Sequence, residues 1–199
     1  MPLDHDARES GGLVPKDVFY QGRRKREVAL RPEPGIQTLV EFRASTAFLS
    51  SFFVGGLVRT DRREEREPAS IITWGRKPYR FLLEPKYTHA YVERVSDSNS
   101  GGGFARWHLR AGPATSARTL SATETGCATD VLRCTGPARS VGYAFSPKFA
   151  VQGFDVRHFS EDGKKITELI DPSVLRGTFR IPGPGYVQIE TSGPWEITL

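Results

Sequence analysis

The chain has 199 residues, of which 38% are hydrophobic and 26% charged, and its formal net charge at pH 7 is +5. This length and composition are those of an ordinary globular protein that buries its own core, and they exclude a disordered or fibrous chain. The most apolar run, residues 47–58, is far shorter than the roughly 20 residues that a membrane-spanning helix needs, so we expect no membrane span.

The first residues of the chain are polar and lead into a run of four basic residues. Residues 1–12 have no apolar segment of the kind found in a secretory signal, so we expect a cytoplasmic location. The four adjacent basic residues are Arg23, Arg24, Lys25 and Arg26. Because adjacent positive charges attract phosphates, anionic lipid and acidic protein surfaces, these four are the candidate binding residues. The alternative is that they lie on a solvated arm that binds nothing.

Strand-forming residues gather in short runs along most of the remaining chain. Turn-forming clusters such as SDSNSGGG, RPEPG and IPGPG separate these runs. The runs are residues 36–43, 79–84, 88–95, 104–109, 149–159, 185–190 and 194–199. Runs of this length with glycine and proline between them are typical of an antiparallel sandwich or barrel. Only residues 168–175 are compatible with a short helix, which Pro172 limits.

The second half of the chain resembles the first half in several places. Residues 47–56 and 144–153 share five of ten residues, and the Trp107-His108-Leu109 stretch aligns with Trp195-Glu196-Ile197. Tyr91 aligns with Tyr186 in the same way. We interpret these similarities as an internal duplication, and we take the aromatic residues that recur in both copies as core residues rather than ligand-binding ones.

These observations predict an all-β protein of two tandem or pseudo-symmetric antiparallel β-sandwich units. The predicted organisation is an extended basic N-terminal arm over residues 1–35, a first repeat over 36–112, a linker over 113–126 and a second repeat over 127–199. Features that one copy has and the other lacks are then the places to look for function.

No catalytic or cofactor signature is visible in the sequence. It contains no Gly-x-Ser-x-Gly elbow, phosphate-binding loop, His-Glu-x-x-His or Cys-x-x-Cys motif. We therefore predict no enzyme activity, no catalytic residues, no cofactor and no metal site. Cys127 and Cys134 have a spacing that would allow a disulfide across one hairpin, although we favour two reduced thiols.

The C-terminal copy resembles a repeat of small, poorly characterised actinobacterial β-sandwich proteins. That repeat contains a strand, an Asp-Gly turn and a closing Gly-x-Trp-x-Ile strand. The matching positions are Asp162-Gly163, Gly183, Gly185 and the segment Gly193-Pro194-Trp195-Glu196-Ile197. The resemblance covers about 50 residues well and the first copy weakly. It implies a β-sandwich fold and no particular activity.

Two classes of function remain open from the sequence. The leading hypothesis is a non-enzymatic structural or protein-interaction module that assembles with other subunits, either copies of itself or a different protein. The alternative is a ligand-binding module for glycans or an anionic polymer, since aromatic side chains make up 11% of the chain and Arg23–Arg26 is basic.

Overall fold

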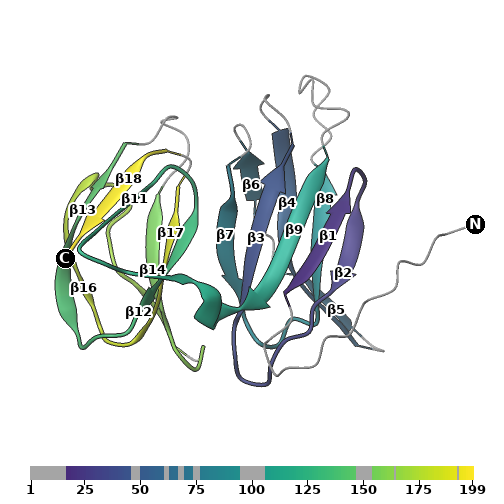
Figure 1. The fold of residues 1–199 in the computed structure, drawn as a ribbon, viewed down its shortest axis with the longest axis horizontal. Coiled ribbons are helices and arrows are strands. Elements are labelled where there is room, and N and C mark those ends of the chain that lie inside the picture. The colour runs from purple at the N-terminus through teal and green to yellow at the C-terminus, as the bar shows by residue number, and fades with distance from the viewer. Residues whose placement is uncertain are drawn as a thin grey trace, which may run out of the picture.

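The fold is taken from a computed structural model that describes residues 17–45, 50–60, 63–66, 70–73, 77–94, 106–146, 154–163, 165–191 and 193–199. The described chain is almost entirely β-strand, and its single helical element is a 3-10 turn, η1 (Ala114–Ser116). The strands form two sandwiches that lie side by side, with η1 between them (Figure 1). The all-β prediction is confirmed, and residues 168–175 are not helical.

The first sandwich, called unit 1, contains sheets A and B. Sheet A has the strand order β1-β9-β3-β7, and sheet B has the order β2-β8-β4-β5 with β6 also paired to β4. The strands are β1 (Val18–Gly22), β2 (Arg26–Ala29), β3 (Thr38–Ala44), β4 (Ser50–Thr60), β5 (Arg63–Arg66), β6 (Ser70–Thr73), β7 (Tyr79–Leu83), β8 (His89–Arg94) and β9 (Trp107–Pro113). Alternate residues of these strands point inward, as in β3, where Val40, Phe42 and Ala44 are buried.

The second sandwich, called unit 2, contains sheets C and D. Sheet C has the order β10-β12-β17-β14-β15 and sheet D the order β11-β18-β13-β16. The strands are β10 (Arg118–Thr119), β11 (Thr123–Gly126), β12 (Asp130–Cys134), β13 (Arg139–Phe145), β14 (Asp155–Ser160), β15 (Ile166–Glu168), β16 (Arg176–Ile181), β17 (Gly185–Glu190) and β18 (Trp195–Thr198). β10 runs parallel to β12, and the other described pairings in both units are antiparallel.

The two units share one strand order. Sheet A corresponds to sheet D strand for strand, with β1, β9, β3 and β7 in the places of β11, β18, β13 and β16. Sheet B corresponds to sheet C in the same way, with β2, β8, β4 and β5 in the places of β12, β17, β14 and β15. Each unit also has one strand without a described counterpart: β6 in unit 1 and, in unit 2, β10, which comes from the connection between the units.

A glycine–tryptophan contact recurs at the matching place in each unit. Gly22 lies opposite Trp107, and Gly126 lies opposite Trp195. A Cβ on either glycine would lie only 2.5 or 2.4 Å from a ring atom of the tryptophan, so a larger residue does not fit there. The indole Nε1 then donates to the carbonyl two residues after the glycine, at 3.1 Å in unit 1 and 2.9 Å in unit 2. The alignment of Trp107 with Trp195 therefore holds.

The strand registers correct the sequence alignment at Tyr91. With Gly22 matched to Gly126, the β2–β8 and β12–β17 registers place Tyr91 at the position of Gln188, two residues away from Tyr186. Tyr186 and Gln188 are two residues apart on β17 and therefore lie on the same face of sheet C, so a sequence comparison does not distinguish them. The similarity of residues 47–56 to 144–153 falls largely outside the described residues.

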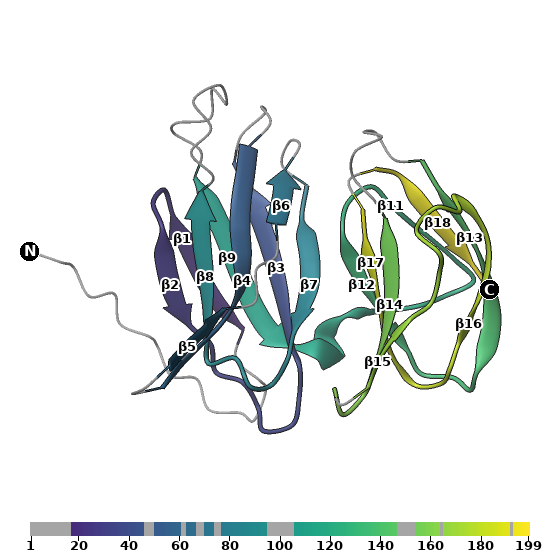
Figure 2. The same cartoon turned by 180° about the vertical axis from the view of Figure 1, so that it is seen from behind.

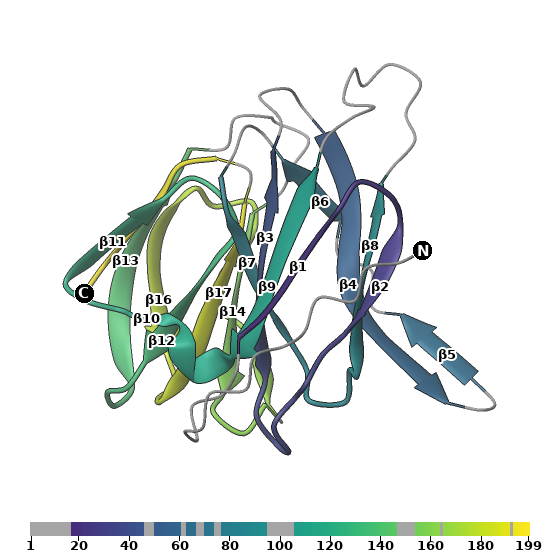
Figure 3. The same ribbon diagram turned by 45° about the vertical axis from the view of Figure 1, so that its right-hand side comes forward.

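The two units pack through sheets A and C, which gives the four-layer order D, C, A, B (Figure 3). Leu39 and Leu82 on the outer face of sheet A meet Val131, Phe159 and Tyr186 on the outer face of sheet C. Two hydrogen bonds fix β7 against unit 2, since the amide of Leu82 donates to Oε1 of Gln188 at 2.8 Å and that of Arg80 to the carbonyl of Thr129 at 3.0 Å. A buried contact of this kind holds the units in one orientation.

The structure places two predicted segments differently. Within residues 1–35, β1 and β2 pair with β9 and β8 and belong to unit 1, so this part of the chain is not an extended arm. Residues 1–16 lie outside the described residues. Within residues 113–126, the 113–120 stretch connects the units, but β11 is a strand of sheet D. Non-local pairing decides both outcomes, because the partners of β1 and β11 lie far along the chain.

Candidate functional site

The four predicted binding residues lie on the turn that carries the chain from sheet A to sheet B. Arg23, Arg24 and Lys25 connect β1 to β2, and Arg26 is the first residue of β2. All four are exposed. Three interactions hold the turn: the Trp107 indole bonds to the Arg24 carbonyl, Lys25 pairs with Glu93 at 2.9 Å, and Nη1 of Arg26 reaches the Gln21 carbonyl at 3.5 Å.

The fold brings two further arginines to this turn. Arg94 ends β8, two residues beyond the Val92 that lies opposite Arg26, and Arg106 directly precedes the Trp107 that lies opposite Gly22. The backbone of Arg106 is fixed to Ser45 by a bond in each direction, at 2.7 and 3.1 Å. We call Arg23, Arg24, Lys25, Arg26, Arg94 and Arg106 the basic end of unit 1. It lies at the β1–β2 turn, seen from behind in Figure 2.

Most positive charges of the basic end have no ion-pair partner among the described residues. Of these six residues only Lys25 has an ion-pair partner within the described part of the chain, and the guanidinium groups of Arg23, Arg24, Arg94 and Arg106 have none there. Their charges therefore add to one local positive potential that favours an anionic partner.

The matching turn of unit 2 has none of these charges. Cys127, Ala128, Thr129 and Asp130 stand where unit 1 has Arg23 to Arg26. The positions of Arg94 and Arg106 are taken by Thr191 and Pro194. The Pro194 assignment follows from a shared bond, since Ser146 donates to the Pro194 carbonyl as Ser45 does to that of Arg106. The fold thus forms this turn without any cation.

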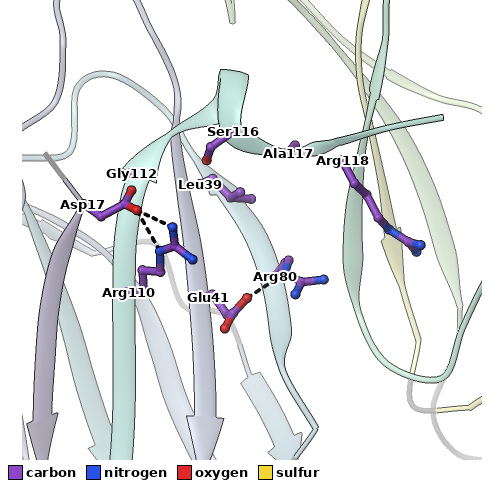
Figure 4. Close-up of a pocket in the computed structure, with 9 residues that line it drawn as sticks. All are labelled: Asp17, Leu39, Glu41, Arg80, Arg110, Gly112, Ser116, Ala117 and Arg118. Carbon is purple, nitrogen blue, oxygen red and sulfur yellow. Dashed lines mark hydrogen bonds and ion pairs between the residues drawn. The ribbon is translucent and has the colours of Figure 1, made fainter. Parts of the chain in front are cut away.

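A second feature lies on the outer face of sheet A, between it and unit 2 (Figure 4). A cavity of about 190 Å³ is lined by Asp17, Leu39, Glu41, Arg80, Arg110, Gly112, Ser116, Ala117 and Arg118. Each of its charged side chains has a partner. Arg110 bonds to Asp17 at 3.0 Å through Nε, Arg80 bonds to Glu41 at 2.8 Å, and Nη1 of Arg118 reaches Glu124 at 2.6 Å.

This ion network joins the two units. Asp130 accepts from Arg80 of unit 1 at 3.3 Å and from Arg118 at 3.0 Å. Burial raises the pKa of Glu41, but hydrogen bonds from Arg80 and Arg43 outweigh it and leave the pKa below its ordinary value. Glu41 is therefore a fixed carboxylate and a poor proton donor. The cavity is best explained as part of the contact between the units.

A shallower hollow of about 620 Å³ lies on the same face toward β1. Its lining is Phe19, Tyr20, Gln21, Glu41, Arg43, His108, Leu109 and Arg110. Phe19 is 70% exposed, with the Arg110 guanidinium 5.4 Å from its ring centroid. An aromatic ring this exposed, above a hollow, is a place where a partner side chain can pack.

In the part of the chain that the structure describes, side chains with nucleophilic or metal-binding chemistry do not converge. Cys127 and Cys134 are free thiols, and burial raises the pKa of Cys134 to about 11, so this thiol is a weak nucleophile near neutral pH. His158 is buried and its ring Nε2 lies 3.2 Å from the Gly183 carbonyl. No group of three His, Cys, Asp or Glu residues within the described ranges could hold a metal ion.

Sequence reasoning found four residues of the basic end and missed two. Arg94 and Arg106 lie about 70 to 80 positions along the chain from the turn, and single arginines at strand ends carry no pattern of their own. The available signal was the Trp107–Trp195 alignment, which pairs Arg106 with an uncharged Pro194 and so marks it as a feature of one copy only.

Comparisons with known proteins give no family for this chain. No protein-family model and no curated protein matches it. Similar solved structures include a proposed secreted protein from Parabacteroides distasonis, at 9% identity and a TM-score of 0.34 over 92% of this chain and 86% of that one. The PBSX exported protein XepA is similar at 8% identity and a TM-score of 0.27 over 92% and 84% of the two chains. At these values neither similarity bears on function. No helix within the described ranges is long and apolar enough to cross a membrane.

Proposed function

We propose that the chain is a non-enzymatic protein-interaction module that assembles with another subunit through the basic end of unit 1. The observation that carries this proposal is the contrast between two equivalent turns, since unit 1 has six cations where unit 2 has none and has Asp130. Because the fold forms without them, the arginines are available for binding. The Trp107 indole holds the turn in place, which lowers the entropy lost on association.

We also propose that the two units arose by internal duplication. The shared strand order and the recurring glycine–tryptophan contact support it. On this view the inner faces kept the residues of the core, while the turns and outer faces diverged. Divergence of a turn toward four adjacent positive charges is the change that we connect with binding.

The test compares two charge-reversal variants of the full chain. One replaces Arg23, Arg24, Arg94 and Arg106 by Glu, and the control replaces Arg176 and Arg180, two exposed arginines of β16 in unit 2, by Glu. Each is used as bait for cross-linking and mass spectrometry in its natural source. We expect cross-links from wild type and control that map to the basic end and are lost in the first variant. Equal cross-linking by all three proteins would overturn the proposal.

An anionic polymer is the alternative occupant of the same surface, and a solution measurement separates it. Binding of labelled nucleic acid or sulfated glycan that weakens steeply with salt, and that the first variant loses, would assign the basic end to a polymer instead of a protein. We expect at most weak binding without sequence preference, because the six cations of the basic end neutralise few phosphates.

A further inference from the structure

The edge strands of the four sheets differ in how they are protected from further pairing. Alternate N–H and C=O groups of an edge strand point away from its neighbour, and charged residues commonly protect such an edge. Charges are present in the other edge strands whose side chains the structure describes: Arg26 and Glu27 in β2, Glu64 in β5, Arg118 in β10, Glu124 in β11, Glu168 in β15 and Arg176 in β16. β7 is covered by unit 2.

Among the residues that the structure describes, nothing gives β1 either kind of protection. Its sequence is VFYQG, with no charged residue and no proline, and it lies at the end of sheet A away from β7. Val, Phe and Tyr are strong strand formers. Phe19 and Gln21 are exposed on the outer face, and Phe19 is exposed to a greater extent than the other large hydrophobic residues described. An edge strand of this composition is an attractive template for one more strand.

β1 is fixed in position by its pairing with β9 and by the side chain of Tyr20. All five residues of β1 are in register with β9, from Val18 opposite Ala111 to Gly22 opposite Trp107. Tyr20 points inward, and its hydroxyl donates to the Ala29 carbonyl at 2.7 Å. An added strand would therefore meet a preformed edge and would not have to order it.

The charges on either side of β1 favour a second copy of the same chain in the antiparallel direction. Residues 1–17, which precede the strand in sequence, contain four acidic and two basic residues, whereas residues 23–26 are all basic. Arg110 compensates Asp17, the nearest of the acids. Antiparallel pairing places the end of β1 that follows residues 1–17 beside the end that leads into residues 23–26 of the other copy, whereas parallel pairing would place the two basic segments beside each other.

We propose that two copies of the chain pair through β1 in an antiparallel, two-fold arrangement that joins their A sheets into one continuous sheet. This rests on the proposed function, because it names the subunit that the basic end contacts. A two-fold interface uses the same patch twice, as most homodimers do. The two Phe19 rings then lie on one face of the joined sheet, where neighbouring aromatic side chains stabilise a strand pair.

The experiment is light scattering after size exclusion over a wide range of protein concentration, with the full chain. We expect a dimer for wild type and a dissociation constant raised about tenfold or more by Phe19→Lys combined with Gln21→Lys, which places lysines of both copies beside each other. Gln21→Lys alone serves as a milder change that leaves the Phe19–Arg110 contact intact. The matched control is Ile166→Lys, an apolar residue 48% exposed on edge strand β15. This control should dimerise like wild type.

Amide hydrogen exchange supplies a second readout that locates the contact. We expect protection of the amides of residues 18–22 to rise with protein concentration in wild type and to stay constant in the double lysine variant. A wild-type chain that is monomeric at all concentrations, or a dimer that the lysines leave unchanged, would overturn the β1 proposal. A monomer whose basic end still gives variant-sensitive cross-links would keep the proposed function and assign a different partner.

Discussion

The outer faces of sheets A and D show how two units with the same strand order acquire different roles. In unit 1, β3 and β7 place Leu39 opposite Leu82, and this pair packs against unit 2. The matching ladder position in unit 2 pairs Ser140 with Arg180, both of which are exposed. One leucine pair therefore separates a sheet that packs against a neighbour from a sheet that faces solvent. The packing of the units is specified by outer-face residues and not by the fold.

The outer faces of sheets C and B differ in the same way. Val131 of sheet C is fully buried against unit 1, and the matching residue of sheet B is Glu27, which pairs with Arg59 at 3.0 Å. The outermost sheets, D and B, therefore lack the apolar residues that form the contact between sheets A and C. In stacked architectures, polar terminal faces of this kind stop further addition. Any larger assembly must use another surface, such as a sheet edge or the basic end.

The largest expected effect comes from the shared glycine–tryptophan contact. Trp107→Ala and Trp195→Ala each remove a fully buried side chain and leave a cavity, and each should lower the free energy of unfolding by about 3–5 kcal/mol. Guanidinium unfolding followed by circular dichroism measures both. Similar losses are expected because the two indoles occupy equivalent positions. A loss below about 1 kcal/mol for either one would show that the positions are not equivalent in energy.

A second change copies the solvent-facing residues of unit 2 onto unit 1. Leu39→Ser with Leu82→Arg should release the units from each other, because removal of a buried leucine costs roughly 2–5 kcal/mol and the arginine would face Val131 and Phe159. We expect separate unfolding transitions in calorimetry and faster proteolysis of the 113–120 connection. The control, Arg180→Ala, should change neither. Retention of a single cooperative transition would place the main contact elsewhere.

The smallest effect is a dependence of unit 2 on pH. Burial lowers the pKa of His158 below its ordinary value of 6.5, despite bonds to the Gly183 and Pro184 carbonyls that raise it. The folded state then binds fewer protons than the unfolded state, so the contribution of this residue is complete above pH 6.5 and is lost as the pH falls below it. Urea midpoints on either side of pH 6.5 measure the effect. His158→Gln should remove it, whereas a dependence that persists would assign it to other groups.

Much of the fold could be predicted from local patterns. Alternating apolar residues and turn clusters gave the β class and seven of the 18 described strands, and the two tryptophans identified equivalent closing strands. The assignment failed at β1 and β2, because the charges of Arg23–Arg26 and the prolines at 32 and 34 obscured two short strands. Their stability comes from pairing with β9 and β8, far along the chain, which a local pattern does not contain.

The candidate site could be predicted only in part, for a related reason. The four adjacent basic residues can be recognised from the sequence alone, but the contribution of Arg94 and Arg106 depends on which strand ends meet. The contact between the units was also hidden, since Leu39 and Leu82 look like ordinary members of their strands. Only the strand registers show that they point outward and not into the core.

The position of β9 and β18 has a consequence for how the chain folds during synthesis. Each is the last strand of its unit, yet each lies between the two strands of its sheet that come first in the chain, β1 and β3 or β11 and β13. Neither sheet can close until its final strand leaves the ribosome, so β1 and β11 wait unpaired while the rest of the unit is made. Sheet A of unit 1 is completed first, before unit 2 is synthesised. The waiting strands are the intermediates most exposed to mispairing, and β1, which carries no charge, is the more vulnerable of the two.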